Sequence, residues 1–312
     1  MQTPVVSVIL PAYNAERYID SAVQSICAQT FTDFEFVIVN DGSRDNTETL
    51  LRAWAERDRR INLISRPNTG YVRALIEAID KSSGPLIARM DADDLASPER
   101  FEKQVAFLNA HPDVVVVGSS YELMDEHDRK LHVLHQPTDD PTLQRHCLAG
   151  TTPICHPSAM FRRAAYTSVG GYDESFCPAE DLDLWLRLGE IGKLACLDEV
   201  LIRYRLHANS VSETRQNKQV DAIRRACQNA ANRRGVPNTF KADAGWREQP
   251  GAAGRVQQLL KYGWWAFNSG ERSTARWYGT RAVRENPACK EAWKLLVVSL
   301  IKPLPAAKAG GR

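Results

Sequence analysis

The chain lacks the glycine-rich loops with which many nucleotide-binding proteins hold phosphate groups. No G-x-x-x-x-G-K-[ST] and no G-x-G-x-x-G segment follows any of its apolar runs. This argues against a P-loop or a dinucleotide-binding domain, because their backbone amides need glycines at those positions to reach a phosphate. The phosphates of any nucleotide bound here must therefore be held by a metal ion.

Paired cysteines and long apolar runs are missing as well. The seven cysteines are scattered and odd in number, and none forms a C-x-x-C pair. Zinc ribbons and disulfide frameworks are therefore not expected. No stretch reaches the about 18 apolar residues of a membrane span, and the N-terminal run lacks the basic segment of a signal peptide. We expect a cytoplasmic chain with reduced thiols.

Short apolar runs alternate with helical patterns in the first part of the chain. Near-continuous apolar strands at this spacing predict an α/β fold with a mostly parallel sheet buried on both faces. The expected strands are 5–10, 34–40, 85–90, 113–123 and 195–207. The expected helices between and after them are 15–30, 47–58, 72–82, 98–110 and 179–193. Residues 135–180 look irregular, and a loop of that length is usually functional.

Charge is distributed unevenly along the 312 residues. Residues 213–312 hold 19 lysines and arginines against 7 aspartates and glutamates, about +12, whereas residues 1–212 carry about −10. Residues 216–234 and 255–300 read as helices without strands between them. We therefore expect a domain at 1–212 followed by a basic α-helical region at 213–312. A basic region indicates an anionic partner such as a membrane surface, although basic helices are also ordinary solvated faces.

Acidic side chains follow the second and third expected strands. Asp41 comes at the end of one strand, where its carboxylate can accept a hydrogen bond from the imide N–H of uracil or thymine. Asp91 and Asp93 follow the other, and in extended geometry they point the same way. Asp94 then falls on the opposite side and is unassigned. Carboxylates in this arrangement suit Mg²⁺ or Mn²⁺, which bind nucleotides together with phosphate oxygens.

Two further segments have a plain structural explanation beside a functional one. Tyr13 follows the first strand and offers a flat face for stacking a base, although the segment also reads as a simple strand-to-helix turn. Glu180 and Asp181 open a helix, where acids are favourable for the helix dipole and where a carboxylate can also act as a base.

The ordered motifs together resemble the family 2 inverting glycosyltransferases of GT-A fold. The resemblance rests on PVVSVILPAYNAERYIDSAVQSICAQTFTDFEFVIVNDGSRDNT, RPNTG, ARMDADD, HPSAMFRR, VGGYDE, EDLDLWLRL and YRLHANSVS, and covers roughly residues 4–212. It implies a Rossmann-like mixed sheet flanked by helices, with the C-terminal helices as an extension.

The resemblance also implies a role for each matching residue. Asp181 would be the general base, with Glu180 beside it, and Asp93 and His207 would bind Mn²⁺ or Mg²⁺. The nucleotide sugar would be bound by Pro11, Ala12, Tyr13, Glu16, Asp41, Gly70, Arg73, Asp91 and Ala92. Arg73 is included as a candidate for contact with the diphosphate. Many relatives carry an arginine five residues after the glycine of N-x-G, where this chain has Leu75, and Arg73 lies nearby.

These features predict an enzyme that moves a sugar from a UDP-sugar to a hydroxyl of a glycan or lipid-linked acceptor. The resemblance implies a hexosyl- or N-acetylhexosaminyltransferase of surface polysaccharide biosynthesis. From the basic region at 213–312 we expect peripheral contact with the inner face of the membrane, and we expect no nucleic-acid partner. One alternative is a nucleotidyltransferase, which usually has a glycine-rich phosphate loop at the first turn. The other is a nucleotide-sugar-binding protein without catalysis.

Overall fold

The computed structural model describes residues 3–207, 216–241 and 252–303, and contacts divide the chain into two compact units. The first unit consists of Met1–Tyr121, His135–Tyr204 and Thr214–Ala242. The second consists of Glu122–Leu134, Arg205–Glu213 and Asp243–Arg312. The predicted domain limit between residues 212 and 213 lies outside the described residues and remains a prediction.

A mixed sheet runs through the described part of the chain in the strand order β3-β2-β1-β4-β8-β6-β9-β5, and β7 pairs with β6. The strands are β1 (Val6–Ala12), β2 (Phe34–Asp41), β3 (Ile61–Arg66), β4 (Leu86–Arg89), β5 (Leu95–Ala96), β6 (Val114–Asp125), β7 (Lys130–Leu134), β8 (Met160–Arg162) and β9 (Lys193–Leu206). The first four strands pair in parallel, whereas β8 is antiparallel to β4 and β6, and β5 is antiparallel to β9. The expected mixed, mostly parallel sheet is confirmed.

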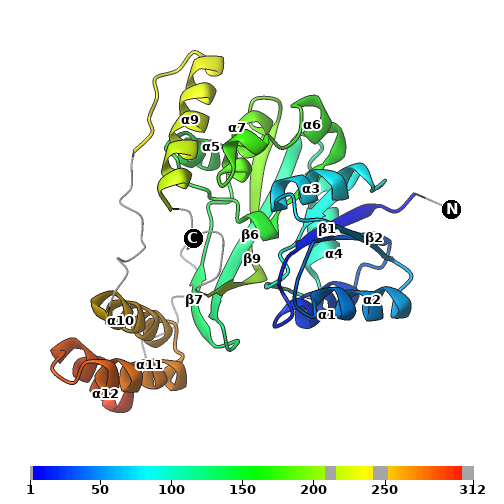
Figure 1. The fold of residues 1–312 in the computed structure, drawn as a ribbon. Coiled ribbons are helices and arrows are strands. Elements are labelled where there is room, and N and C mark those ends of the chain that lie inside the picture. Colours follow the sequence, from blue (N-terminus) through cyan, green and yellow to red (C-terminus); the bar gives the residue numbers. More distant parts are fainter. Residues whose placement is uncertain (1–2, 208–215, 242–251, 304–312) are drawn as a thin grey trace. The chain divides into compact units, whose positions relative to one another are not determined.

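Helices cover both faces of this sheet in the first unit (Figure 1). On one face α1 (Ile19–Cys27), α2 (Thr47–Arg57) and α4 (Arg100–Ala110) pack on the even-numbered apolar side chains of β1 and β2. On the other face lie α3 (Tyr71–Asp80), α7 (Glu180–Leu188) and α9 (Gln216–Arg234), around the fully buried Trp185. Continuous apolar strands arise because successive side chains enter opposite cores.

The expectation of an irregular segment over residues 135–180 is wrong. This segment contains α5 (Asp140–Leu148), the short strand β8, α6 (Arg163–Ser168) and two 3₁₀ turns, His156–Ser158 and Glu174–Phe176. The start of α5 follows an ordinary rule, because Asp139 caps it by accepting the amide of Thr142 at 3.0 Å. The three residues of β8 are too few to show a strand period, so only their pairing between β4 and β6 identifies them.

The described part of the second unit contains three helices, the end of β6 with β7, and the end of β9 with His207. The helices are α10 (Ala252–Asn268), α11 (Arg272–Glu285) and α12 (Lys290–Ile301), which pack on one another. The chain reversal between β6 and β7 contacts them, since Tyr278 donates a hydrogen bond to Asp125 at 2.6 Å and His132 contacts Ser269 at 3.0 Å. The helices predicted over 216–234 and 255–300 are present, the second as three helices.

Candidate active site

Three predicted site segments meet at one edge of the sheet in the first unit. Strand β1 pairs in parallel with both β2 and β4, so the carboxyl ends of these neighbours open on the same side. Those ends carry Tyr13, Asp41 and Asp91 respectively. Ligands of open α/β sheets bind at this edge, where backbone groups leave the ladder. The sheet therefore brings the three candidate residues to one edge.

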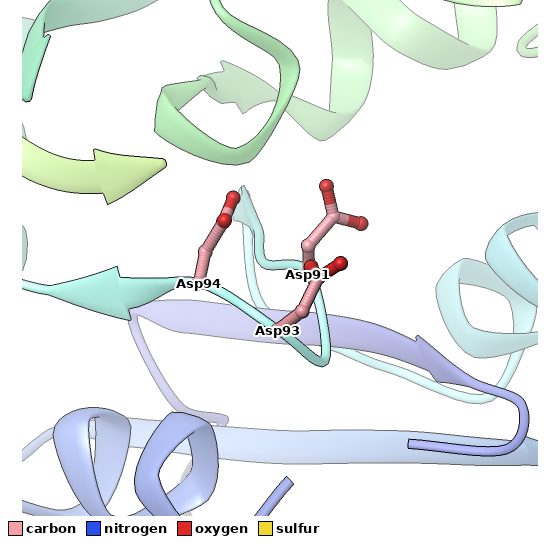
Figure 2. Close-up of side chains that lie close together, drawn as sticks. All are labelled: Asp91, Asp93 and Asp94. Carbon is pink, nitrogen blue, oxygen red and sulfur yellow. The ribbon is translucent and has the colours of Figure 1, made fainter. Parts of the chain in front are cut away.

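The residues 91–94 form an acidic turn between β4 and β5. Ligand oxygens of Asp91, Asp93 and Asp94 all lie within 4.8 Å of one another, and Figure 2 shows the three side chains extending from this turn. Asp91 and Asp93 are half-buried, and Asp94 is buried. Clustered carboxylate oxygens are the donors that Mg²⁺ and Mn²⁺ prefer, so the residues fit such an ion.

The inclusion of Asp94 corrects the sequence interpretation. We expected extended geometry, in which Asp94 points away from Asp91 and Asp93. The chain turns at Ala92 and Asp93 instead, and a turn does not alternate its side chains as a strand does. Asp94 is thus a candidate ligand that the period-two pattern assigned to the wrong side.

A buried arginine offsets the negative charge of the acidic turn. Arg89, the last residue of β4, is 4% exposed and forms an ion pair with Asp91. Burial opposes the charge of the guanidinium, but the Asp91 carboxylate more than offsets this, so the pKa of Arg89 lies above its ordinary value. A buried charge needs such a partner. The ion pair of Arg89 with Asp91 therefore holds the acidic turn against the end of β4.

The loops after β1 and β2 are joined by hydrogen bonds in both directions. Glu16 accepts from the backbone amide and the side chain of Asn46, at 2.9 and 3.0 Å, and its own amide donates to Asp45 at 3.1 Å. Glu16 therefore fixes one loop to the other. Tyr13 remains 47% exposed beside this junction, whereas Pro11 and Ala12 are buried at the end of β1. An exposed ring on a fixed loop is available for stacking on a base.

Asp41 organises the loop that follows β3. Its Oδ1 accepts the amide of Thr69 and its Oδ2 accepts the amide of Gly70, each at 2.9 Å. Arg66 forms an ion pair with Oδ1 at 3.0 Å, and Asn68 donates to the Asp41 carbonyl at 2.8 Å. Arg66 was not among our candidates, although it opens the RPNTG segment. The loop at 67–70 is thus anchored on the carboxylate that we expect to contact the base.

Arg73 and Leu75 differ sharply in environment, although both lie on α3. Leu75 is fully buried in the core, so no arginine-like role is open to it. Arg73 is more than half exposed and pairs with Glu174 at 2.7 Å. Its predicted contact with a diphosphate would require release of this exposed pair, which costs little.

Of the two acids at the start of α7 in the first unit, Glu180 is buried and Asp181 is half-buried. Glu180 is 3% exposed, and its Oε2 accepts the hydroxyl of Tyr71 at 2.7 Å. Asp181 accepts the amide of Leu182 at 2.7 Å. Burial raises the pKa of Asp181 to about 6, and burial together with the neighbouring Asp181 raises the pKa of Glu180 to about 7. Carboxyls that titrate near neutral pH are suited to accept and release a proton.

His207 directly follows β9 and is half-buried. It belongs to the second unit, whereas the acidic turn belongs to the first. Within the described residues, the side chains whose ligand atoms lie together are those of the acidic turn, and His207 is not one of them. Its role as a metal ligand remains a prediction.

A mixed sheet of this order with an acidic turn at its carboxyl edge is typical of nucleotide-sugar-dependent GT-A glycosyltransferases. The chain belongs to glycosyl transferase family 2, whose model matches residues 7–170. It is 33% identical to an uncharacterized glycosyltransferase of Haemophilus influenzae over 231 residues, covering 71% of this chain and 72% of the relative. It is 29% identical to the amylovoran biosynthesis glycosyltransferase AmsE of Erwinia amylovora, covering 67% of this chain and 79% of AmsE.

Solved structures share the fold at lower sequence identity. S. aureus TarS 1–349 in complex with UDP-GlcNAc matches with a TM-score of 0.60 and 15% identity, over 94% of this chain and 90% of that one. The mannosyltransferase PcManGT from Pyrobaculum calidifontis, in complex with GDP-Man and Mn²⁺, matches with a TM-score of 0.58 and 21% identity, over 97% and 83%. These matches establish a GT-A-like architecture for the chain.

Proposed function

We propose that this glycosyltransferase moves a hexosyl or N-acetylhexosaminyl group, with inversion, from a UDP-sugar to a hydroxyl of a glycan or lipid-linked acceptor. The observation that carries the proposal is the acidic turn at 91–94, which opens on the same sheet edge as Tyr13 and Asp41. AmsE, a relative named for amylovoran biosynthesis, supports a place in surface polysaccharide biosynthesis.

The donor half of the site is built from the loops after β1, β2 and β4. Tyr13 stacks on the base above Pro11 and Ala12. Oδ2 of Asp41 accepts the Gly70 amide and has a second lone pair with which it accepts the imide N–H of uracil. UDP-GlcNAc bound by TarS supports the choice of a uridine donor.

The oxygens of Asp93, with those of Asp91 and Asp94, would hold a divalent cation beside the diphosphate, and Ala92 places them in the turn. When bound, such an ion neutralises the charge that grows on the leaving nucleoside diphosphate. The Mn²⁺ held by PcManGT supports this assignment. Asp91 also keeps its ion pair with Arg89, so Asp93 is our principal ligand.

Asp181 provides the base for the acceptor. The acceptor oxygen forms a bond to the anomeric carbon as the bond from that carbon to the diphosphate breaks, and the hydroxyl proton passes to the Asp181 carboxylate. Attack from the side opposite to the leaving group inverts the anomeric centre. The family assignment favours this reaction over nucleotidyl transfer, and the remaining alternative is nucleotide-sugar binding without turnover.

A panel of nucleotide sugars tests the donor directly. UDP, TDP and GDP release is measured for the full chain with UDP-, TDP- and GDP-linked hexoses and N-acetylhexosamines in the presence of Mn²⁺. We expect release from a UDP-sugar at a rate at least about tenfold above the others. Only uridine and thymidine present an imide N–H to Asp41, and thymidine lacks the 2′-hydroxyl of the uridine ribose. Binding of a UDP-sugar without release of UDP would support the non-catalytic alternative.

We also propose that the basic C-terminal region contacts anionic lipid, where a lipid-linked acceptor would be found. Among the described residues, α12 exposes Trp293, Val297, Leu300 and Ile301, which are spaced along one face of the helix. Lysines in the same helix and an excess of basic residues over 213–312 complement anionic headgroups. No helix within the described ranges has the length and apolar character needed to cross a bilayer.

Co-sedimentation of the full chain with vesicles tests this contact. We expect binding to vesicles that contain phosphatidylglycerol, weaker binding at high salt, and loss of binding in the variant Trp293→Ser/Leu300→Ser, because the apolar face and the charges act together. Ile191→Ser is the matched control, since Ile191 is 52% exposed in the first unit. Failure to sediment with anionic vesicles, or equal sedimentation of the double variant, contradicts the proposal.

A further inference from the structure

A buried hydrogen bond joins two parts of the site that are 109 residues apart in sequence. The Tyr71 hydroxyl donates to Oε2 of Glu180 at 2.7 Å, and Glu180 immediately precedes the proposed base. The Cys177 thiol donates to the same hydroxyl at 3.5 Å. With its acceptor side occupied by the thiol, the hydroxyl directs its proton to Glu180.

The other end of this connection is the loop anchored on Asp41. Gly70 precedes Tyr71 directly, has a φ of +105° and donates its amide to Asp41 at 2.9 Å. Tyr71 is the first residue of α3, so the tyrosine cannot shift along its helix axis without moving that loop. The start of α3 is thus fixed to Asp41 by the backbone amide of Gly70 and to α7 by the side chain of Tyr71.

Glu180 is confined on its other side as well. Its Oε1 lies 3.9 Å from Nδ1 of His156, and Nε2 of His156 contacts the Tyr172 hydroxyl at 2.7 Å. Glu180, His156 and Tyr172 are buried, and Tyr71 is half-buried. A buried carboxyl that accepts the Tyr71 hydroxyl on one side and packs against His156 on the other fixes the first turn of its helix, and therefore the direction of the next side chain, Asp181.

We propose that Tyr71 is a positioning residue, which acts through Glu180 to hold Asp181 in register with the donor loop anchored on Asp41. This inference rests on the proposed role of Asp181 as the base. Its physical basis is that a misplacement of about 1 Å between reacting groups can cost about a hundredfold in rate. Tyr71 itself does not touch the reacting atoms.

The test is a double-mutant cycle with Tyr71→Phe, Glu180→Leu, which removes the acceptor of the Tyr71 hydroxyl, and the double variant, measured as kcat and KM for UDP-sugar turnover by the full chain. We expect Tyr71→Phe to lower kcat about tenfold or more and to change KM for the donor less than about threefold, since the base is displaced while the donor loop stays anchored. Because Tyr71 acts through Glu180, the double variant should be no slower than Glu180→Leu alone.

Tyr166→Phe is the matched control. Tyr166 is a buried tyrosine whose hydroxyl accepts the Tyr172 amide at 3.2 Å, and no contact of its side chain reaches Glu180 among those of the described residues. It should keep wild-type kcat. Unchanged kcat in Tyr71→Phe, or multiplicative losses in the double variant, overturns the inference. Asp181→Asn distinguishes the role of Asp181 as the base from the positioning role of Tyr71. If Asp181→Asn is inactive while Tyr71→Phe is unimpaired, only the positioning role is contradicted.

Discussion

Asp181→Asn is expected to lower the rate of sugar transfer at least about a hundredfold, the usual range for loss of a general base. Asparagine keeps the size of the side chain and its hydrogen bond from the Leu182 amide, but it cannot accept the proton of the acceptor hydroxyl. The variant should therefore fold and bind UDP as the wild type does. The loss should appear in kcat, as measured by UDP release under saturating UDP-sugar.

The pH dependence of the wild type provides a second check on the same residue. Burial raises the pKa of Asp181 to about 6. The base acts in its ionised form, which is present above this pKa, so kcat should rise with pH through about 6 and then level off.

Asp113→Asn serves as the control variant for Asp181→Asn, because Asp113 is exposed at the surface and pairs with Lys193. A kcat for Asp181→Asn within threefold of the Asp113→Asn value would contradict the assignment of the base.

Much of the first unit follows from local sequence patterns. The strands β1, β2 and β4 were predicted within about two residues of their observed ends, because each is a continuous apolar run that enters two cores. The position of Asp41 and Asp91 at the carboxyl ends of neighbouring strands follows from the parallel pairing. The sequence order of motifs was therefore enough to place these side chains at one edge of the sheet.

Other parts depend on contacts that no local pattern reports. The strand β8 is defined by its antiparallel pairing with β4 on one side and β6 on the other. Its three residues are too few to show the alternation of apolar and polar side chains that predicts a strand. Asp94 joins the acidic turn because the backbone turns at 92–93, whereas a period-two pattern assumes an extended chain. The contact of Tyr71 with Glu180 spans 109 residues and needs the packing of α3 beside α7.

Asp93→Ala is the second change with a large expected effect, a loss of at least about a hundredfold in UDP release, since a metal ion supplies several kcal/mol of charge stabilisation at a leaving phosphate. Asp91 keeps its ion pair with Arg89, and Asp94 is only 1% exposed, whereas Asp93 is half-buried. We therefore expect neither Asp91 nor Asp94 to replace Asp93 as the principal metal ligand. Removal of one carboxylate also lowers the affinity for the ion, because Mg²⁺ and Mn²⁺ are held by few protein ligands.

The most direct measurement is a titration of the EDTA-treated full chain with Mn²⁺, followed by UDP release from a UDP-sugar, for the wild type and for Asp93→Ala in parallel. The wild type should be inactive without metal and regain turnover as Mn²⁺ or Mg²⁺ is added. Asp93→Ala should remain at least about a hundredfold slower throughout the titration. Equal turnover of both proteins without a divalent cation would contradict the acidic turn as the centre of the reaction.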